Sequence, residues 1–253
     1  MSGPIVREIE AKSILNASKI YDYCVNPYTG CEVGCVYCYA ALFMRLYGGH
    51  SEPWGEFVDV KINAPALLAK QIVKAKRGTI WFASVCDPYQ PREERYGLTR
   101  RSLEVLAGRD FPVEIQTKSS RVRRDLDVIR RIPDAEVGFT IATEDETIAR
   151  LFEPKASPIQ ERIEVLREFR AAGVSTFVFA GPLLPGNPEK LAALLAGAAD
   201  RVLIDRMNYV PAVRGFYARH GLLDALTDSF FRTQSTRLAR ALRARGIRVE
   251  TVF

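Results

Sequence analysis

Short apolar runs alternate with longer amphipathic stretches along most of this chain. Runs rich in β-branched and aromatic residues predict buried strands, whereas apolar residues three or four positions apart predict helices. The expected strands cover residues 79–85, 113–117, 136–141, 175–179, 201–204 and 248–252, and an aromatic run at 20–23 is a candidate for a strand before them. The expected helices cover residues 64–76, 99–107, 122–131, 158–172, 188–199 and 228–245.

This alternation is typical of an α/β fold, in which a parallel sheet carries helices on its outside. The sheet is either open and doubly wound or closed toward a barrel, and in both the ligand site lies at the carboxyl ends of the strands. A length of 253 residues suits one α/β barrel. Because no Gly/Ser-rich linker divides the chain, we expect a single domain over residues 1–253.

The most clearly marked helix is expected to begin after Ser157. This serine has the position of an N-cap, Pro158 that of the first helical residue, and Gln160 completes a capping box. Gly173 ends the pattern. The buried stripe predicted for this helix consists of Ile159, Ile163, Leu166 and Phe169.

The composition is that of a folded, water-soluble protein, with 47% hydrophobic and 26% charged residues. A net charge of +6 is mildly basic and compatible with nucleic acid as a partner. The first twelve residues lack the apolar core of a secretory signal, and no stretch approaches the ~20 apolar residues of a membrane span. We therefore expect a cytoplasmic protein without membrane segments; its oligomeric state is left open.

Three of the five cysteines, Cys31, Cys35 and Cys38, have the spacing C-x3-C-x2-C. In a reducing compartment such a group indicates a metal site or a cluster. Three thiolates can hold three irons of a cubane cluster and leave the fourth iron open. A closed zinc site is the alternative, but no second cysteine pair follows and both histidines lie far along the chain. Cys24 stands seven residues before Cys31, a spacing that favours a core or loop thiol.

The cysteine motif, with Tyr37 just before its last cysteine, resembles the signature of the radical S-adenosylmethionine (SAM) enzymes. Residues 26–40, the segment 87–91 and the pair Glu153 and Pro154 resemble the spore photoproduct lyase-like branch, also called DNA repair photolyase-like. The resemblance covers roughly residues 20–210.

The resemblance implies a partial (β/α)6 TIM-type barrel of parallel strands with outer helices, forming a single radical SAM core domain with short N-terminal and C-terminal extensions. It implies a 4Fe-4S cluster held by Cys31, Cys35 and Cys38, and SAM on the open iron. An electron from a flavodoxin- or ferredoxin-type donor then cleaves SAM to a 5′-deoxyadenosyl radical, which abstracts a substrate hydrogen. The cofactors perform this chemistry, and the protein binds, orients and excludes water.

Polar residues follow two of the predicted strands, where a parallel sheet places its ligand. The resemblance makes Ser84, Cys86 and Asp87 candidates for SAM binding, although Asp87 before Pro88 also suits an Asx turn. The other residues that the resemblance and the strand ends make cofactor candidates are Tyr37, Lys118, Ser119 and Thr140. Ser119 also suits a helix cap.

Arg162 falls on the inward stripe of its helix and near its N-terminus, where a cation needs an anionic partner. That partner is either Glu153, in a structural ion pair, or the SAM carboxylate. The segment 178–183, which ends in Leu183, resembles the strand against which these enzymes pack adenine. At the next strand, Asp205, Arg206 and Asn208 are expected to face the substrate.

The substrate is expected to be a nucleic acid base or photolesion, with Cys86 as a candidate catalytic hydrogen-atom donor. Basic pairs and runs suit either of two arrangements, a track along a phosphate backbone or solvated helix faces; they comprise Arg100, Arg101, Arg121, Arg123, Arg124, Arg130 and Arg131. A small molecule or peptide is the alternative substrate. A non-catalytic iron–sulfur protein for electron transfer or redox sensing is the alternative of another class.

Overall fold

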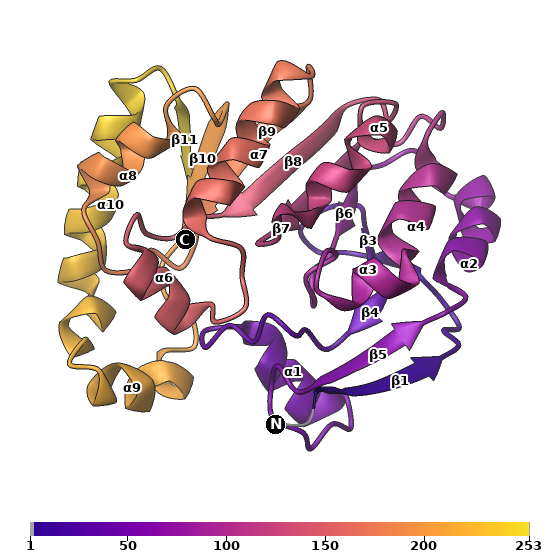
Figure 1. Ribbon diagram of the computed structural model, residues 1–253, viewed down its shortest axis with the longest axis horizontal. Coiled ribbons are helices and arrows are strands. Elements are labelled where there is room, and N and C mark those ends of the chain that lie inside the picture. The colour runs from indigo at the N-terminus through magenta and orange to yellow at the C-terminus, as the bar shows by residue number, and fades with distance from the viewer. Residues whose placement is uncertain (1–2, 253) are drawn as a thin grey trace.

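The computed structural model describes residues 3–252. Its main sheet has the order β11–β10–β9–β8–β7–β6–β3–β2, in which the neighbours from β3 to β11 are parallel and β2 is an antiparallel edge (Figure 1). The strands are β2 (Leu15–Ala17), β3 (Tyr23–Val25), β6 (Ile80–Phe82), β7 (Val113–Thr117), β8 (Ala135–Thr140), β9 (Ser175–Ala180), β10 (Arg201–Ile204) and β11 (Arg248–Thr251).

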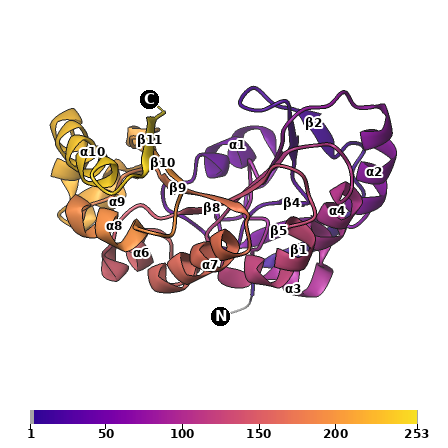
Figure 2. The same ribbon diagram turned by 90° about the horizontal axis from the view of Figure 1, so that it is seen from above.

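Helices connect these parallel strands and lie outside the curved sheet, which stays open between β11 and β2 (Figure 2). This is the partial barrel that the sequence predicted. The α-helices are α1 (Tyr39–Tyr47), α2 (Ala64–Gln71), α3 (Arg92–Tyr96), α4 (Leu98–Leu106), α5 (Leu126–Ile129), α6 (Glu146–Phe152), α7 (Ile159–Ala171), α8 (Pro188–Leu195), α9 (Val210–Arg219) and α10 (Asp228–Arg243). Three 3₁₀ helices complete the set: η1 (Ile72–Lys74), η2 (Ser120–Asp125) and η3 (Leu223–Leu226).

A second, smaller sheet that the sequence analysis did not anticipate supports the loop after β4. In it β1 (Ile5–Ile9) pairs in parallel with β5 (Phe57–Lys61), and β4 (Tyr28–Thr29) pairs antiparallel to β5. The strand that leads into the cysteine loop, β4, therefore pairs with β5, and β5 in turn pairs with β1.

The largest apolar cluster joins outward-facing strand residues to the covering helices. Successive strand residues point to opposite faces, so Ile115 and Phe139 contribute to this cluster while Glu114 and Gln116 face the barrel interior. Burying each large apolar side chain contributes about 1.5–3 kcal/mol relative to exposure. Among residues 3–252, no helix is long and apolar enough to cross a membrane.

Two strand expectations differ from the structure at their ends. The aromatic run at 20–23 is mostly not a strand, because the Ser18 hydroxyl accepts from the backbone N–H groups of Ile20 and Tyr21 and turns the chain there; β3 begins at Tyr23. Strand β6 ends at Phe82 rather than at residue 85. The reason is Ala83, whose φ of 77° lies in the left-handed region and ends the extended run.

The capping box predicted at Ser157 is absent. Helix α7 begins at Ile159 with Pro158 as its N-cap, and the N–H of Ile159 donates to the Glu146 carboxylate at 2.9 Å. The Ser157 hydroxyl instead accepts from the backbone N–H of Ser120 at 2.8 Å. A long-range contact thus replaces the local one. The predicted stripe of α7 is buried as expected.

A tight contact inside the barrel makes Gly138 sensitive to substitution. A Cβ atom there would come closer than 3.0 Å to the Phe177 ring, and overpacking a core costs about 1–3 kcal/mol. We expect Gly138→Ala to lower the free energy of unfolding by that amount in urea titrations. Gly215→Ala on exposed α9, where the nearest atom is 3.6 Å away, should raise stability by up to about 1 kcal/mol. Equal effects of the two substitutions would contradict this packing.

Candidate functional site

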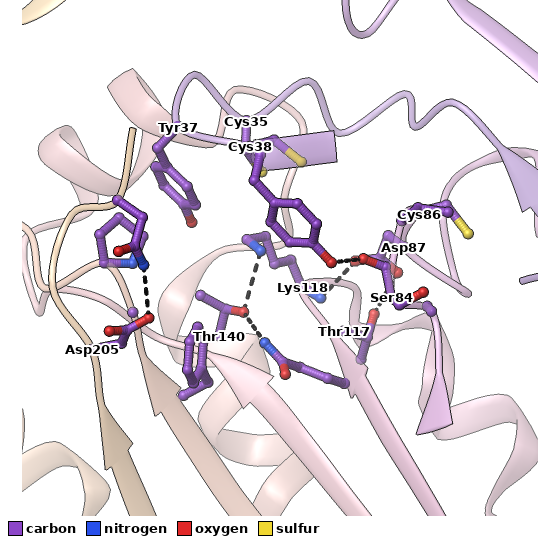
Figure 3. A pocket seen from close by; sticks show the side chains of 18 of the residues that line it. Cys35, Tyr37, Cys38, Ser84, Cys86, Asp87, Thr117, Lys118, Thr140 and Asp205 are labelled. Atoms are coloured by element: carbon purple, nitrogen blue, oxygen red, sulfur yellow. Dashed lines mark hydrogen bonds between the residues drawn. The ribbon is translucent and has the colours of Figure 1, made fainter. Parts of the chain in front are cut away.

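The three motif cysteines lie on the loop between β4 and α1. Cys31 and Cys35 are buried, and Cys38 is the N-cap of α1. The loop begins at Gly30, whose φ is +82° and where a Cβ atom would collide with the carbonyl of Phe57 in β5. Glycine is therefore required at this position. Figure 3 shows Cys35 and Cys38 on the side of the cavity opposite Thr140 and Asp205.

Backbone donors face two of the thiols. The N–H of Asp87 donates to the Cys31 sulfur at 3.3 Å, and the N–H groups of Ala40 and Ala41 in the first turn of α1 face Cys38. Burial raises the pKa of both thiols, and for Cys38 these helical N–H groups act in the opposite direction. Donors of this kind favour a thiolate ligand.

Gln90 brackets Cys31 from both sides. Its side-chain amide accepts from the N–H of Glu32 at 3.0 Å and donates to the carbonyl of Gly30 at 3.2 Å. Gln90 is fully buried, so no water competes for these two backbone groups. The bracket fixes the backbone on either side of the first cysteine.

A second attachment holds the other end of the motif. The N–H of Val36 donates to the carbonyl of Phe152 at 2.9 Å, and the Tyr37 hydroxyl donates to Glu153. Glu153 in turn pairs with Arg162 at 2.6 Å, both fully buried. The three segments on which the sequence resemblance depended are therefore neighbours in space.

The cysteines open into one cavity of about 570 Å³ inside the barrel. Polar residues at the carboxyl ends of β6, β7, β8 and β10 line it together with the thiols. The predicted site residues that line this cavity are Cys31, Cys35, Tyr37, Cys38, Ser84, Cys86, Asp87, Lys118, Thr140, Asp205, Arg206 and Asn208.

The carboxylate of Asp87 accepts three hydrogen bonds within the protein. One oxygen accepts from the N–H of Tyr89 at 2.9 Å, which is the Asx turn, and from the Thr117 hydroxyl at 2.6 Å. The other accepts from the N–H of Lys118 at 2.7 Å. Asp87 therefore ties the ends of β6 and β7 together and presents its own N–H to Cys31 (Figure 3).

Lys118 places a positive charge among the thiols. Its ammonium donates to the Thr140 hydroxyl at 3.2 Å and lies 5.7 Å from the centre of the Tyr37 ring. Burial lowers the pKa of Lys118, but Cys35 and Glu153 raise it, and the net shift is upward. The lysine therefore stays charged, and it lowers the pKa of Cys35 against the effect of burial.

Three predicted cofactor residues lie outside the cavity lining. Arg162 donates to Glu153 and to the backbone carbonyls of Thr140 and Ser157, so the structural ion pair is the arrangement found. Ser119 is buried and caps η2 by accepting from Arg121. The side chain of Leu183 packs into the main core, while its N–H donates to the carbonyl of Asp205.

A polar network that sequence reasoning missed fills the barrel near the amino ends of its strands. Arg201 pairs with Glu114 at 2.9 Å and with Glu136 at 2.5 Å, and the Tyr21 hydroxyl donates to Glu114. We call Tyr21, Glu114, Glu136 and Arg201 the barrel floor. These charges occupy inward positions of strands that the sequence analysis took only as buried runs; their alternation with apolar residues was the available signal.

The basic runs are largely neutralised by carboxylates. Arg100 pairs with Asp125 and Asp127, and Arg123 pairs with Glu168. Arg121 and Arg124 have acidic partners as well. Of the two interpretations, helix faces with ion pairs fit these four arginines better than a phosphate track.

The bracket by Gln90 predicts a specific loss. Gln90→Leu keeps the approximate volume but leaves two buried backbone groups unpaired, at about 1–3 kcal/mol. We expect lower stability in urea and roughly 10-fold weaker iron retention after anaerobic reconstitution, as for outer partners of ligands. Gln160→Leu is the matched control, since Gln160 is exposed and bonds only to Glu164. Iron retention equal to that of the control would refute the role of the bracket.

Comparisons with known proteins agree with this geometry. The family model described as the radical SAM superfamily matches residues 25–196. An uncharacterized protein of Methanocaldococcus jannaschii is 34% identical over 180 residues, which cover 70% of this chain and 67% of that protein. The radical SAM Nα-GlyT isomerase of Pseudomonas phage M6 is 25% identical over 163 residues, which cover 64% of this chain and 33% of that protein.

The fold is similar to that of spore photoproduct lyase complexed with dinucleoside spore photoproduct. The TM-score is 0.71 at 17% identity, with 97% of this chain and 81% of that chain covered. At this identity the likeness shows the fold alone, and it confirms the predicted partial barrel. Enzymes of the radical SAM superfamily use a 4Fe-4S cluster and SAM. The superfamily model matches more than half of this chain, so the chain belongs to the radical SAM superfamily.

Proposed function

We propose that Cys31, Cys35 and Cys38 hold the 4Fe-4S cluster and that SAM occupies the adjoining cavity. The single observation that carries this proposal is the cavity itself, which joins the three thiols to the polar ends of four strands. The donor set also fits: the cysteines are the only thiols on a loop that two buried side chains hold in place. Within residues 3–252 no three His, Cys, Asp or Glu side chains converge on one metal ion, whereas in a cubane each thiol binds its own iron.

When bound, the cluster and SAM supply a 5′-deoxyadenosyl radical that takes a hydrogen atom from the substrate. The chain's own residues bind and orient the reactants. Lys118 offers an ammonium for the SAM carboxylate or a ribose hydroxyl, and Ser84 and Thr140 line the same cavity. Tyr37 offers an aromatic edge beside the last cysteine.

The remaining candidate residues support the cavity lining indirectly, through the residues that they contact. Arg162 holds Glu153, which accepts from Tyr37, and so orients the tyrosine. Ser119 fixes the turn after Lys118 by capping η2, and Leu183 supports the backbone beside Asp205. Asp87 aligns two strand ends. The barrel floor fills the other end of the barrel and limits the access of water there.

For the substrate, we propose a nucleic acid base, including a base damaged by light. The fold neighbour that was solved with a dinucleoside spore photoproduct supports this class. The net charge of +6 is compatible with a polyanion. The electron donor is proposed to be a flavodoxin- or ferredoxin-type protein.

Cys86 is proposed as the residue that gives a hydrogen atom to the product radical. One electron from the proposed flavodoxin- or ferredoxin-type donor and one proton from water then convert the resulting thiyl radical back to the thiol. Cys86 is among the residues that line the cavity, and its sulfur lies 3.9 Å from the amide oxygen of Asn26. Burial raises its pKa to about 12, so the sulfur carries its hydrogen at neutral pH. A protonated thiol is the form that can donate a hydrogen atom.

The first test is an anaerobic assay of the reconstituted enzyme with dithionite and SAM. We expect 5′-deoxyadenosine by mass spectrometry, at a higher rate with ultraviolet-irradiated DNA than with undamaged DNA. Cys31→Ala, Cys35→Ala and Cys38→Ala should each lower the rate by more than roughly 100-fold, since losing a ligand costs more than losing a partner of one. Cysteine-dependent cleavage that ignores DNA would reject the nucleic acid substrate and redirect the search to small molecules and peptides.

The role of Cys86 is tested by separating cleavage from product formation. Cys86→Ala should leave SAM cleavage within a few-fold of wild type but lower the yield of repaired bases at least roughly 10-fold, a typical loss for one proton- or hydrogen-transfer group. Cys24→Ala is the matched control, because Cys24 does not line the cavity. An unchanged product yield in Cys86→Ala would remove Cys86 from the mechanism.

A further inference from the structure

Helix α1 is apolar on nearly every side, yet it buries only Ala40. Its sequence, YAALFMRLY, holds one charged residue, Arg45. Helices with so little polar surface are normally buried, but Leu46 is 60% exposed and Tyr47 is 80% exposed. A contiguous exposed apolar surface of this kind marks an interaction site.

The exposed side chains form one strip along the helix. Tyr39, Phe43 and Tyr47 are four residues apart, and successive rings have centroid distances of 6.0 and 6.1 Å. Leu42 and Leu46 form a second row beside them. The α1 strip, defined as these five residues, runs the length of a nine-residue helix, about 13 Å at 1.5 Å per residue.

The strip begins at the proposed cluster. Cys38 is the N-cap of α1, and its thiol faces the N–H groups of the first helical turn. Tyr39 lines the cavity beside the cysteines. A protein docked on the strip would lie within a few helical residues, at about 1.5 Å of rise each, of the site that must receive an electron.

The chemistry of the strip favours an acidic protein over a nucleic acid. Aromatic residues and arginine are enriched and carboxylates depleted at protein interface cores, and the helix offers aromatic and leucine side chains, Arg45 and no carboxylate. Binding of single-stranded nucleic acid requires cations along the stacking rings, and here one arginine accompanies three rings. The chain's charge of +6 complements an acidic partner.

We propose that the α1 strip is the docking surface for an acidic electron-transfer protein of the flavodoxin or ferredoxin type. The inference rests on the proposed function, because it places the electron's entry beside the three cysteines. In the step that it serves, one electron passes from the partner's reduced flavin or iron–sulfur centre to the enzyme's cluster. No bond is made or broken.

The test compares a protein reductant with a chemical one. With reduced flavodoxin, Leu46→Glu should lower 5′-deoxyadenosine formation at least roughly 10-fold, since a charge buried without a partner costs more than 1.4 kcal/mol at an interface. With dithionite, which needs no docking, the rate should stay within two-fold of wild type, taken as roughly the scatter of such comparisons. Val73→Glu is the matched control, because Val73 is 70% exposed on η1, far from α1 in sequence.

Binding gives a second readout that does not depend on catalysis. Calorimetric titration of flavodoxin into the enzyme should show an affinity that falls as the salt concentration rises. The substitutions Leu46→Glu and Arg45→Glu should both weaken this affinity, and Val73→Glu should leave it unchanged. If Leu46→Glu also lowered the dithionite rate, Tyr47→Ser would decide in its place, since this side chain is the most exposed of the strip.

Several outcomes would overturn the inference. Flavodoxin binding and flavodoxin-driven cleavage that are equal in wild type, Leu46→Glu and Tyr47→Ser would reject it. So would variants that lose affinity for a DNA oligonucleotide, or that convert a dimer into a monomer in light scattering, while flavodoxin binding is unchanged. A wild-type enzyme that cleaves no SAM even with dithionite would instead refute the proposed function, which is a distinct result.

Discussion

The cysteine loop has no helix or strand of its own, and the fixed position of its thiols depends on buried hydrogen bonds from distant parts of the chain. Gln90 holds the backbone around Cys31, and Glu153 holds Tyr37 beside Cys38. A buried polar group without a partner costs about 1–3 kcal/mol, so each of these contacts stabilises one arrangement of the loop strongly over its alternatives. The local sequence alone would leave the thiols mobile.

Hydrogen bonds within the protein also position the polar side chains of the cavity. The Asp87 carboxylate accepts three hydrogen bonds within the protein, from a turn, a neighbouring hydroxyl and a backbone N–H. The Lys118 ammonium, by contrast, donates one hydrogen bond to a side chain of the described residues, the Thr140 hydroxyl, and lies in the cavity lining. Residues that look equivalent in sequence, both polar and both at strand ends, therefore differ in their contacts: the Asp87 carboxylate joins two strand ends, and the Lys118 ammonium bonds to Thr140.

The distribution of charged side chains and the exposure of apolar side chains indicate different interaction surfaces. Four arginines of the basic runs pair with carboxylates of neighbouring segments: Arg100, Arg121, Arg123 and Arg124. An exposed pair such as Arg123 with Glu168 contributes little stability, but it keeps that guanidinium on a carboxylate rather than on a phosphate. The surface that stands out is instead the apolar α1 strip, which carries almost no charge and begins at the cysteines.

The sequence by itself determined the alternation of strands and helices and the three thiols of a cluster, because periodicity and ligand spacing are local properties. The class of chemistry followed from the family that the same motif resembles. The sequence also placed the polar strand ends at one edge of the sheet, since parallel strands share that edge. Only the tertiary structure decided that Arg162 pairs with Glu153, that Ser157 does not cap α7, and that Arg201 joins two strands in the barrel floor. Each of these depends on partners many residues away, which no local pattern specifies. The small sheet of β1, β4 and β5 was not predicted either: β4 has two residues, and β5 pairs with segments that lie on the other side of the cysteine loop in the sequence.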